Sequence, residues 1–337
     1  MSATEASAPT SPVRVSVCLL VFNHARVLRD AVESVLAQEL RSFELILSDD
    51  CSTDESWEVI QALAREDPRI RAIQTPRNVG MAANANFAVR HASAPYVALL
   101  HHDDICAPAL LSRWLDVAER HPSVAFVSNA YGFYQSPQVD YHPFEECTQG
   151  QRALERTLFR RWGCPIRGTA LIRRSCWDAV GGMRERFGML ADVDLWMRLA
   201  ARWDVGYVRE PLILVRQERP EDYPEAYVRW SWPRFKLLYD IHASNRSEYF
   251  EARPVRRELE KQIFRWKVSF DELYWLTYGV VRRRWDILST SAEVSNPYEL
   301  LGLRRTRELL AQLARRKLNA GVPRHAARSA MESDDAS

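Results

Sequence analysis

The chain has 337 residues, of which 47% are hydrophobic and 27% are charged, and its formal net charge is +2. This is the composition of a globular protein with an ample core, and so small a net charge gives no support to nucleic-acid binding. The six cysteines form no CxxC pair, no run approaches the roughly 20 apolar residues of a membrane span, and the start of the chain lacks signal-peptide features. We therefore expect reduced thiols and a cytoplasmic location.

The first 130 residues alternate between apolar strands and amphipathic helices. Strands are predicted at 14–22, 43–48, 69–75, 95–100 and 124–128, and helices at 26–38, 54–65, 81–91 and 108–120. This order is typical of a parallel sheet with right-handed crossovers. We predict an α/β fold with a mostly parallel central sheet flanked by helices.

The alternation loosens after residue 130. Residues 131–161 are predicted as a long loop with one helical turn, followed by a strand at 165–172, a helix at 190–202 and short strands at 205–208 and 212–215. From about 225 the sequence becomes aromatic, basic and helical. On one face of a predicted helix lie Leu259, Ile263, Trp266, Phe270 and Leu273, and on one face of another lie Leu303, Leu310, Leu313, Ala314 and Leu318.

The predicted organisation follows from these shifts. Residues 1–12 are expected to be disordered, 13–224 to form the α/β domain, 225–320 to be helical, and 321–337 to be a disordered tail.

One strand ends in His101, His102, Asp103 and Asp104. Adjacent carboxylates repel each other unless a cation or hydrogen-bond donors neutralise them. Carboxylates bind Mg²⁺ or Mn²⁺, with diphosphate oxygens and waters completing the shell. The site is therefore a metal candidate, and the alternative is an exposed acidic loop. A transition-metal site that uses both histidines lacks the usual ligand spacing.

A second acidic group, Asp49, Asp50 and Asp54, follows the strand at 43–48. A carboxylate at a strand end can accept the imide N–H of uracil or thymine, a donor that cytosine lacks. Asp54 is interpreted as a helix cap. Capping does not account for both Asp49 and Asp50.

A third group, Asp192, Asp194 and Trp196, opens the helix at 190–202. Because the two carboxylates are two residues apart, they face different directions on a helix. One can serve as a general base in a cleft while the other caps or pairs. Trp196 either stacks on a sugar ring or belongs to the core.

The order and spacing of these motifs resemble the family 2 glycosyltransferases over about residues 13–220. The motifs are Phe22-Asn23, Asp49-Asp50-x-Ser52-x-Asp54, Asn78-x-Gly80, Asp103-Asp104, Gly181-Gly182 and Asp192-x-Asp194-Leu-Trp196-x-Arg198. The resemblance implies a GT-A fold with a nucleotide-sugar half at 13–122 and an acceptor half at 123–224. It also implies metal-assisted inverting transfer from a nucleotide-diphosphate sugar.

The resemblance also implies roles for individual residues. Asp50 would read the base, Asp103 and Asp104 would hold ribose and metal, and Asp192 would be the catalytic base. Nucleotide-sugar contacts would further come from Phe22, Asn23, Asn78 and Gly80, and acceptor contacts from Asp194 and Trp196. The implied cofactor is Mn²⁺ or Mg²⁺. UDP or dTDP is the favoured nucleotide, and the acceptor would be a surface glycan or lipid-linked oligosaccharide of bacterial type.

Four positions depart from the family pattern, and two rival functions remain. His101 stands where the first strand-end aspartate is common, Ala191 replaces a glutamate, Ala85 an arginine, and Glu218 a histidine. The changes at His101, Ala191 and Glu218 are the support for the main alternative, a catalytically degenerate transferase kept as a binding or scaffold protein. A nucleotidyltransferase is the other, but no Gly-rich basic loop follows the first strand.

The helical region carries two further expectations. Its helices pack on the catalytic domain or form a homo-oligomer, and the basic amphipathic segment 303–318 lies on an anionic membrane surface at the inner face of the membrane.

Overall fold

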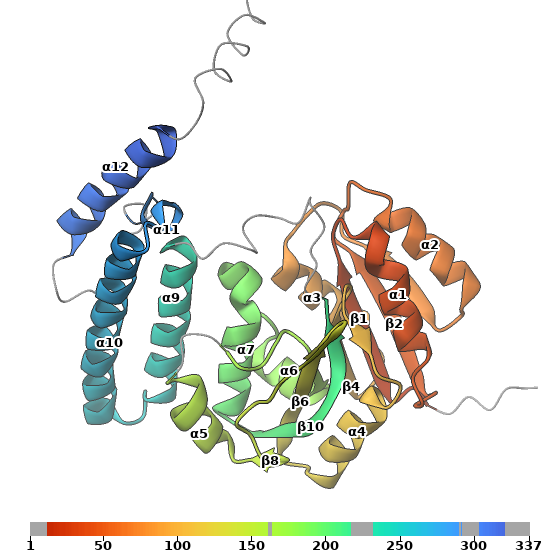
Figure 1. Cartoon of the computed structure of the whole chain (residues 1–337). Helices are drawn as coiled ribbons and strands as arrows, with labels where there is room; N and C mark the ends of the chain where they lie inside the picture. Colours follow the sequence, from red (N-terminus) through yellow and green to blue (C-terminus); the bar gives the residue numbers. More distant parts are fainter. Residues whose placement is uncertain (1–11, 161–163, 217–231, 290, 292–302, 321–337) are drawn as a thin grey trace, which may run out of the picture. The chain divides into compact units, whose positions relative to one another are not determined.

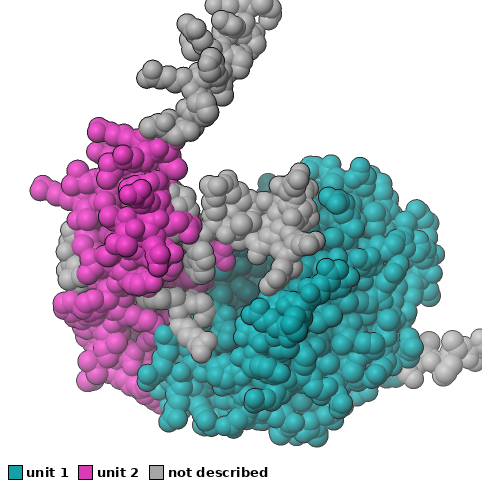
Figure 2. Space-filling view, in the orientation of Figure 1, with its two compact units in different colours: residues 1–221 teal, residues 222–337 magenta. Residues whose placement is uncertain are grey.

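The structure, a computed structural model, describes residues 12–160, 164–216, 232–289, 291 and 303–320. The chain divides into two compact units, residues 1–221 and 222–337 (Figures 1 and 2). Three predicted features lie outside the described residues: the boundary at residue 224, the disordered ends with the exception of residue 12, and Glu218.

The first unit is built on a ten-stranded sheet with the main strand order β3-β2-β1-β4-β9-β6-β10-β5. Four neighbouring strands run parallel: β3 (Ile70–Gln74), β2 (Phe43–Asp49), β1 (Val15–Val21) and β4 (Tyr96–His101). Strand β9 (Ala170–Arg173) lies antiparallel between β4 and β6 (Val124–Phe133), and β10 (Asp204–Val215) runs parallel to β6. The short strands β5 (Ile105–Cys106), β7 (Ser136–Asp140) and β8 (Cys147–Thr148) pair antiparallel with β10, β6 and β10. The predicted α/β class is confirmed.

Helices cover both faces of this sheet, which is why its strands read as nearly continuous apolar runs (Figure 1). One core cluster joins alternate residues of β1, β2 and β4 to the apolar faces of α1 (Ala25–Leu36), α2 (Ser56–Glu66) and α4 (Leu110–Arg120). Helices α3 (Met81–Arg90), α6 (Arg174–Val180) and α7 (Ala191–Ala200) contact β1, β2, β9 and β6.

The predicted loop at 131–161 was wrong for most of its length. Strand β6 continues to Phe133, and β7, β8, α5 (Gly150–Ala153) and a π-helical turn, η1 (Leu154–Leu158), follow it. The polar residues Ser128 and Asn129, which suggested the strand's end, are buried within it. Side-chain polarity alone did not mark the end of a strand whose backbone is paired with β9 and β10.

The two short strands predicted at 205–208 and 212–215 form the single strand β10. Its register against β6 shifts on both sides of Pro211. Proline has no backbone N–H to donate, so the ladder is interrupted there while the chain stays extended.

The part of the second unit that the structure describes is helical. They are α9 (Trp232–Tyr249), α10 (Pro254–Val281), α11 (Trp285–Ser289) and α12 (Arg304–Ala320). Helix α10 buries Phe264, Val268 and Leu276, whereas the predicted stripe from Leu259 to Leu273 lies on its exposed side. No described helix is both long and apolar enough to cross a membrane.

The apolar face predicted for 303–318 is split between the two sides of α12. Ala314 is buried, whereas Leu313 and Leu318 are exposed. A buried ion pair between Arg307 Nη1 and Glu272 Oε1, 2.7 Å apart, ties α12 to α10. Because the guanidinium and the carboxylate neutralise each other, the charged Arg307 side chain can be buried on the helix face where the sequence predicts apolar residues.

Candidate functional site

The chain leaves β1 and β2 through left-handed turns at Asn23 (φ 55°) and Cys51 (φ 57°). The Asn23 N–H donates to Ser52 Oγ at 3.0 Å, and Asn23 Oδ1 accepts from the Thr53 N–H at 2.8 Å. Asparagine tolerates this backbone region better than most residues. The loops after neighbouring parallel strands are therefore joined at one edge of the sheet. Phe22 is half-buried, and its carbonyl accepts a hydrogen bond from His24 Nδ1 at 2.6 Å.

Asp50 is buried and holds the loop that precedes α3. Its Oδ1 accepts from the Val79 N–H at 2.9 Å, and its Oδ2 accepts from the Gly80 N–H at 2.8 Å. Gly80 has a φ of 86°, which strains any residue with a Cβ. Oδ1 also accepts from Thr75 Oγ1 at 2.9 Å, so the second lone pair of Oδ2 is what Asp50 retains for a ligand N–H.

The other carboxylates of this loop are structural. Asp49 is fully buried and accepts hydrogen bonds from Ser52 and from Gln74 Nε2. Asp54 accepts from the Ser56 N–H at the start of α2 and from the Ala25 N–H at the start of α1, each at 3.0 Å. The N-cap position of α2 is Glu55, so Asp54 lies one residue before the predicted cap and binds the first N–H of each helix from there.

A pocket of about 680 Å³ lies beside this loop. Asn78, Arg77 and Val79 line one side of it, and Phe87 and Arg90 of α3 line another. Asn78 is exposed, whereas the Gly80 N–H is already used by Asp50. Of the two residues predicted to contact a nucleotide, Asn78 thus has an exposed side chain that can bind a ligand, whereas the backbone N–H of Gly80 is already hydrogen-bonded.

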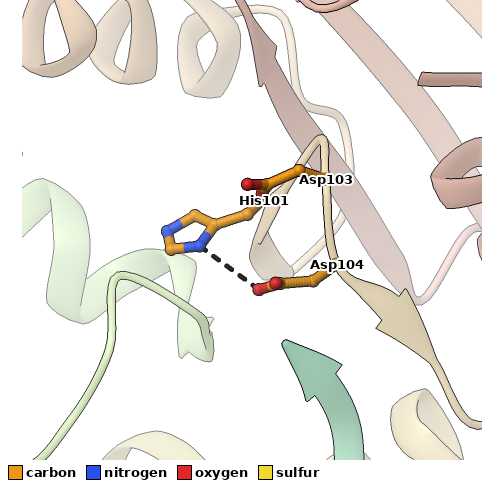
Figure 3. Close-up of side chains that lie close together, drawn as sticks. All are labelled: His101, Asp103 and Asp104. Atoms are coloured by element: carbon orange, nitrogen blue, oxygen red, sulfur yellow. Dashed lines mark ion pairs between the residues drawn. The ribbon is translucent and has the colours of Figure 1, made fainter. Parts of the chain in front are cut away.

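His101, Asp103 and Asp104 gather at the end of β4, and one ligand atom from each lies within 4.8 Å of the others (Figure 3). Asp104 is buried, and its Oδ1 has no hydrogen-bond partner among the described residues. A buried carboxylate oxygen without a partner is costly unless something binds it. Two carboxylates and one imidazole are a donor set that suits Mn²⁺, and with more waters Mg²⁺. The residues present therefore fit a divalent metal.

Arg167, which the sequence analysis did not single out, lies against this cluster. Its Nη2 is 3.2 Å from Asp104 Oδ2 and 3.1 Å from His101 Nδ1. Burial acts to raise the pKa of the Asp104 carboxyl, but the bond with His101 and the charge of Arg167 outweigh it and hold that pKa below its usual value. The only hint in the sequence is a basic residue just before a strand, and such residues are common.

His102 points away from the cluster into the protein. Its ring lies 3.9 Å from that of His24, and its Nδ1 is 2.7 Å from the Leu20 carbonyl oxygen, to which it donates. Burial lowers the pKa of His102 to about 4, so the imidazole is neutral at physiological pH. Of the two adjacent histidines, only His101 belongs to the candidate metal cluster.

Asp192 stands at the start of α7, and its carboxylate and the His101 imidazole both border the position that a Cβ on Gly168 would take. A Cβ built on Gly168 would lie 2.8 Å from His101 Nε2 and 3.4 Å from Asp192 Oδ2. Burial raises the pKa of the Asp192 carboxyl to about 6. A hydrogen bond from the Val193 N–H and the charges of His101 and Arg167 act in the opposite direction and lower that pKa, but burial outweighs them. The tertiary structure thus brings the predicted base next to the predicted metal cluster.

Asp194 and Trp196 do not match their predicted contact with an acceptor. Trp196 is fully buried, and its ring centroid lies 4.8 Å from that of Phe126, so neither ring face is open to a sugar. Asp194 is also fully buried and pairs with Arg198 Nε at 2.7 Å. Arg198 donates further to the carbonyls of Val180 and Gly182, which fixes α7 to the turn before it. Both residues therefore serve packing.

Sequence comparison identifies a family and relatives of this chain. The sequence model of "Glycosyl transferase family 2" matches residues 16–181. EpsE of Bacillus subtilis (strain 168), a protein named as a glycosyltransferase, is 31% identical over 215 residues, which are 61% of this chain and 73% of EpsE. WfaP of Escherichia coli, named as a UDP-Glc:alpha-D-GlcNAc-diphosphoundecaprenol beta-1,3-glucosyltransferase, is 29% identical over 136 residues. That alignment spans 38% of this chain and 53% of WfaP.

Structural comparison agrees on the fold. The crystal structure of S. aureus TarS 1–349 in complex with UDP-GlcNAc superposes with a TM-score of 0.62 at 16% identity, covering 90% of this chain and 88% of that one. At this identity the likeness concerns the fold alone. The expected GT-A fold is confirmed.

Proposed function

Because this chain belongs to glycosyl transferase family 2, we propose that it moves a sugar from a nucleotide-diphosphate sugar to a hydroxyl acceptor with inversion at the anomeric carbon. The observation that carries the proposal is the convergence of Asp192 with the cluster of His101, Asp104 and Arg167 around Gly168. A base and a charge-neutralising group on one site are what a displacement of diphosphate requires.

The proposed reaction is a single displacement. The Asp192 carboxylate takes the proton of the acceptor hydroxyl while the hydroxyl oxygen bonds to the anomeric carbon. The bond from that carbon to the diphosphate oxygen breaks, and the nucleotide diphosphate leaves with the electron pair. A base with a pKa of about 6 is well matched to this task at neutral pH, since it is ionised yet more basic than an ordinary aspartate.

Asp103, Asp104 and His101 are proposed to hold a divalent cation, Mn²⁺ or Mg²⁺. When bound, this cation offsets the negative charge that builds on the departing diphosphate. His101 takes the place where relatives commonly have an aspartate, so the donor set carries one negative charge less. Arg167 adds a positive charge at the same point, and a guanidinium is a group that suits phosphate oxygens.

We propose UDP or dTDP as the nucleotide. The support is the remaining acceptor capacity of Asp50, which suits the imide N–H of uracil or thymine. The names of two comparison proteins also contain UDP sugars, as donor in WfaP and as ligand in TarS. WfaP acts on a lipid-linked diphosphate sugar by its name, which supports a glycan or lipid-linked acceptor here.

Contact with an anionic membrane is proposed for segment 303–318. Leu309, Leu313 and Leu318 are exposed on α12 beside Arg304 and Arg305. Co-sedimentation with anionic vesicles at low and high salt tests this, and no binding at low salt refutes it. Self-association through the exposed stripe of α10 is a separate proposal, tested by sedimentation velocity over a range of concentrations.

The decisive experiment offers the protein a panel of UDP, dTDP, GDP and CDP sugars with Mn²⁺ and lipid-linked acceptors. Product is followed by mass spectrometry and nucleotide release by chromatography. We expect sugar transfer from a UDP or dTDP donor that EDTA abolishes and Mn²⁺ restores. Binding of donors without any transfer or slow hydrolysis would instead favour a scaffold role.

A further inference from the structure

The helical unit contains a pocket of about 670 Å³ between α9 and α10, and most of its polar lining is cationic. Its charged and hydroxyl side chains are Arg246, Ser247, Arg257, Glu258, Lys261 and Arg265. The volume lies within the range of small-molecule sites. Four cations therefore face one carboxylate around a space that a small ligand would fill.

Carboxylates within the unit offset only part of this charge. Arg246 pairs with Glu260 at 2.7 Å, and Lys261 lies 3.7 Å from Glu258. Arg257 donates to Ser247 Oγ at 2.6 Å, and neither it nor Arg265 forms an ion pair with any residue that the structure describes. Arg265 Nε is buried and has no hydrogen-bond acceptor among the residues that the structure describes. An anion in the pocket would supply the missing acceptor.

The arrangement along α10 strengthens the positive field. Arg257, Lys261 and Arg265 follow one another at intervals of four residues, so they share one helix face and repel each other. They span about 12 Å along the helix axis at 1.5 Å per residue. Pro254, the first residue of this 28-residue helix, also lines the pocket, which places the positive end of the helix dipole there.

We propose that this pocket binds a phosphate ester or diphosphate, with Arg257 and Arg265 as its principal ligands. Guanidinium groups match phosphate oxygens in a bidentate fork, and two of them on one face suit two phosphates or one doubly charged group. The ring of Phe264 gives the pocket an apolar wall for the organic part of the ligand. The phosphate belongs to either a soluble metabolite or a lipid headgroup, because the arginines of the pocket would bind the same phosphate oxygens in both.

The test is isothermal titration of the full chain with pyrophosphate in EDTA at fixed ionic strength, because EDTA removes the metal on which the proposed donor site depends. The variant Arg257→Gln with Arg265→Gln should bind about tenfold more weakly or worse. The control Arg41→Gln with Arg65→Gln removes the same charge from exposed positions of the first unit, which belong to neither the pocket nor segment 303–318, and should match the wild type. Glu258→Gln removes the one carboxylate of the lining and should bind more tightly, an effect that misfolding cannot mimic.

Vesicles of phosphatidylglycerol and of phosphatidylcholine distinguish the two sources. If a headgroup is the ligand, the pocket variant loses binding to phosphatidylglycerol and pyrophosphate competes with it in the wild type. If the ligand is soluble, vesicle binding is the same in both variants while pyrophosphate binding differs. The proposal is overturned if the wild type binds no pyrophosphate, or if both double variants lose affinity equally.

Discussion

The guanidinium of Arg167 lies 3.2 Å from the carboxylate of Asp104, although 63 residues separate them in the sequence. This contact is possible because β9 pairs antiparallel with β4, so the segment that enters β9 arrives at the end where β4 delivers its acidic residues. It places a fixed positive charge beside His101, which stands where the family resemblance of the sequence implies an aspartate.

Arg167→Gln should lower the stability of the metal-free protein by about 1–3 kcal/mol, because the buried Asp104 carboxylate loses a charged donor. Added Mn²⁺ should raise the melting temperature of this variant more than that of the wild type, since the ion then meets an unopposed carboxylate. Thermal unfolding with and without Mn²⁺ measures both effects, and Arg167→Lys should restore part of the stability. Equal metal responses in wild type and variant would rule out a shared role for Arg167 and the cation at Asp104.

Asp192→Asn should reduce the rate of sugar transfer by about 10²–10⁴-fold while leaving donor affinity unchanged, because the amide cannot take a proton. Single-turnover kinetics and calorimetry separate the two quantities. Asp178→Asn, a change at an exposed carboxylate of α6 paired with Arg174, serves as the control and should retain full rate. Full turnover in Asp192→Asn would show that another group is the base.

The pH dependence of transfer follows from the raised pKa of Asp192. Because the base acts when ionised, the rate should be half-maximal near pH 6, reach its plateau about one pH unit higher, and fall about tenfold per unit below pH 6. An aspartate at its usual pKa near 4 would keep the plateau down to pH 5. A profile of kcat/KM between pH 4.5 and 8 distinguishes the two, and a plateau that persists to pH 5 would contradict the assignment.

His101→Ala should weaken Mn²⁺ binding by about 10–100-fold, whereas the adjacent His102→Ala should act mainly on stability. The reason is that His101 lies in the cluster with Asp103 and Asp104, while His102 is half-buried and donates to the Leu20 carbonyl. Electron paramagnetic resonance of free Mn²⁺ gives the affinities, and urea unfolding gives the stabilities. If the two variants bind Mn²⁺ equally well, His101 is not a ligand.

Gly168→Ala should impair transfer with little change in stability. Its new Cβ would lie 2.8 Å from His101 Nε2, so the imidazole must move away from Asp192 and the metal cluster. Gly80→Ala is the contrasting variant: no atom lies within 4 Å of its Cβ, but its φ of 86° strains the backbone and should cost about 1 kcal/mol of stability. Steady-state rates and melting temperatures for both variants test this contrast, which fails if Gly168→Ala keeps the wild-type rate.

The sequence by itself determined the four parallel strands β1 to β4, the helices between them and the acidic strand ends. Hydrophobic periodicity is local, so β1 to β4 and their crossover helices were predicted within a few residues, and carboxylates that directly follow a strand must lie at its end. Asp50, Asp103 and Asp104 were found in this way. The same local argument placed Asp54 at the start of α2 within one residue of the N-cap Glu55, because its hydrogen bond with the Ser56 N–H is local.

Only the tertiary structure decided which polar residues face the site and which are buried. Trp196 and Asp194 occupy positions of the right type for a site, but Phe126 and Arg198 cover them. Arg167 and Gly168 carry no local signal, and they reach His101, Asp104 and Asp192 only because β9 is inserted beside β4. Contacts between segments far apart in the chain depend on strand pairing and packing, and the periodicity of one segment does not encode its neighbours.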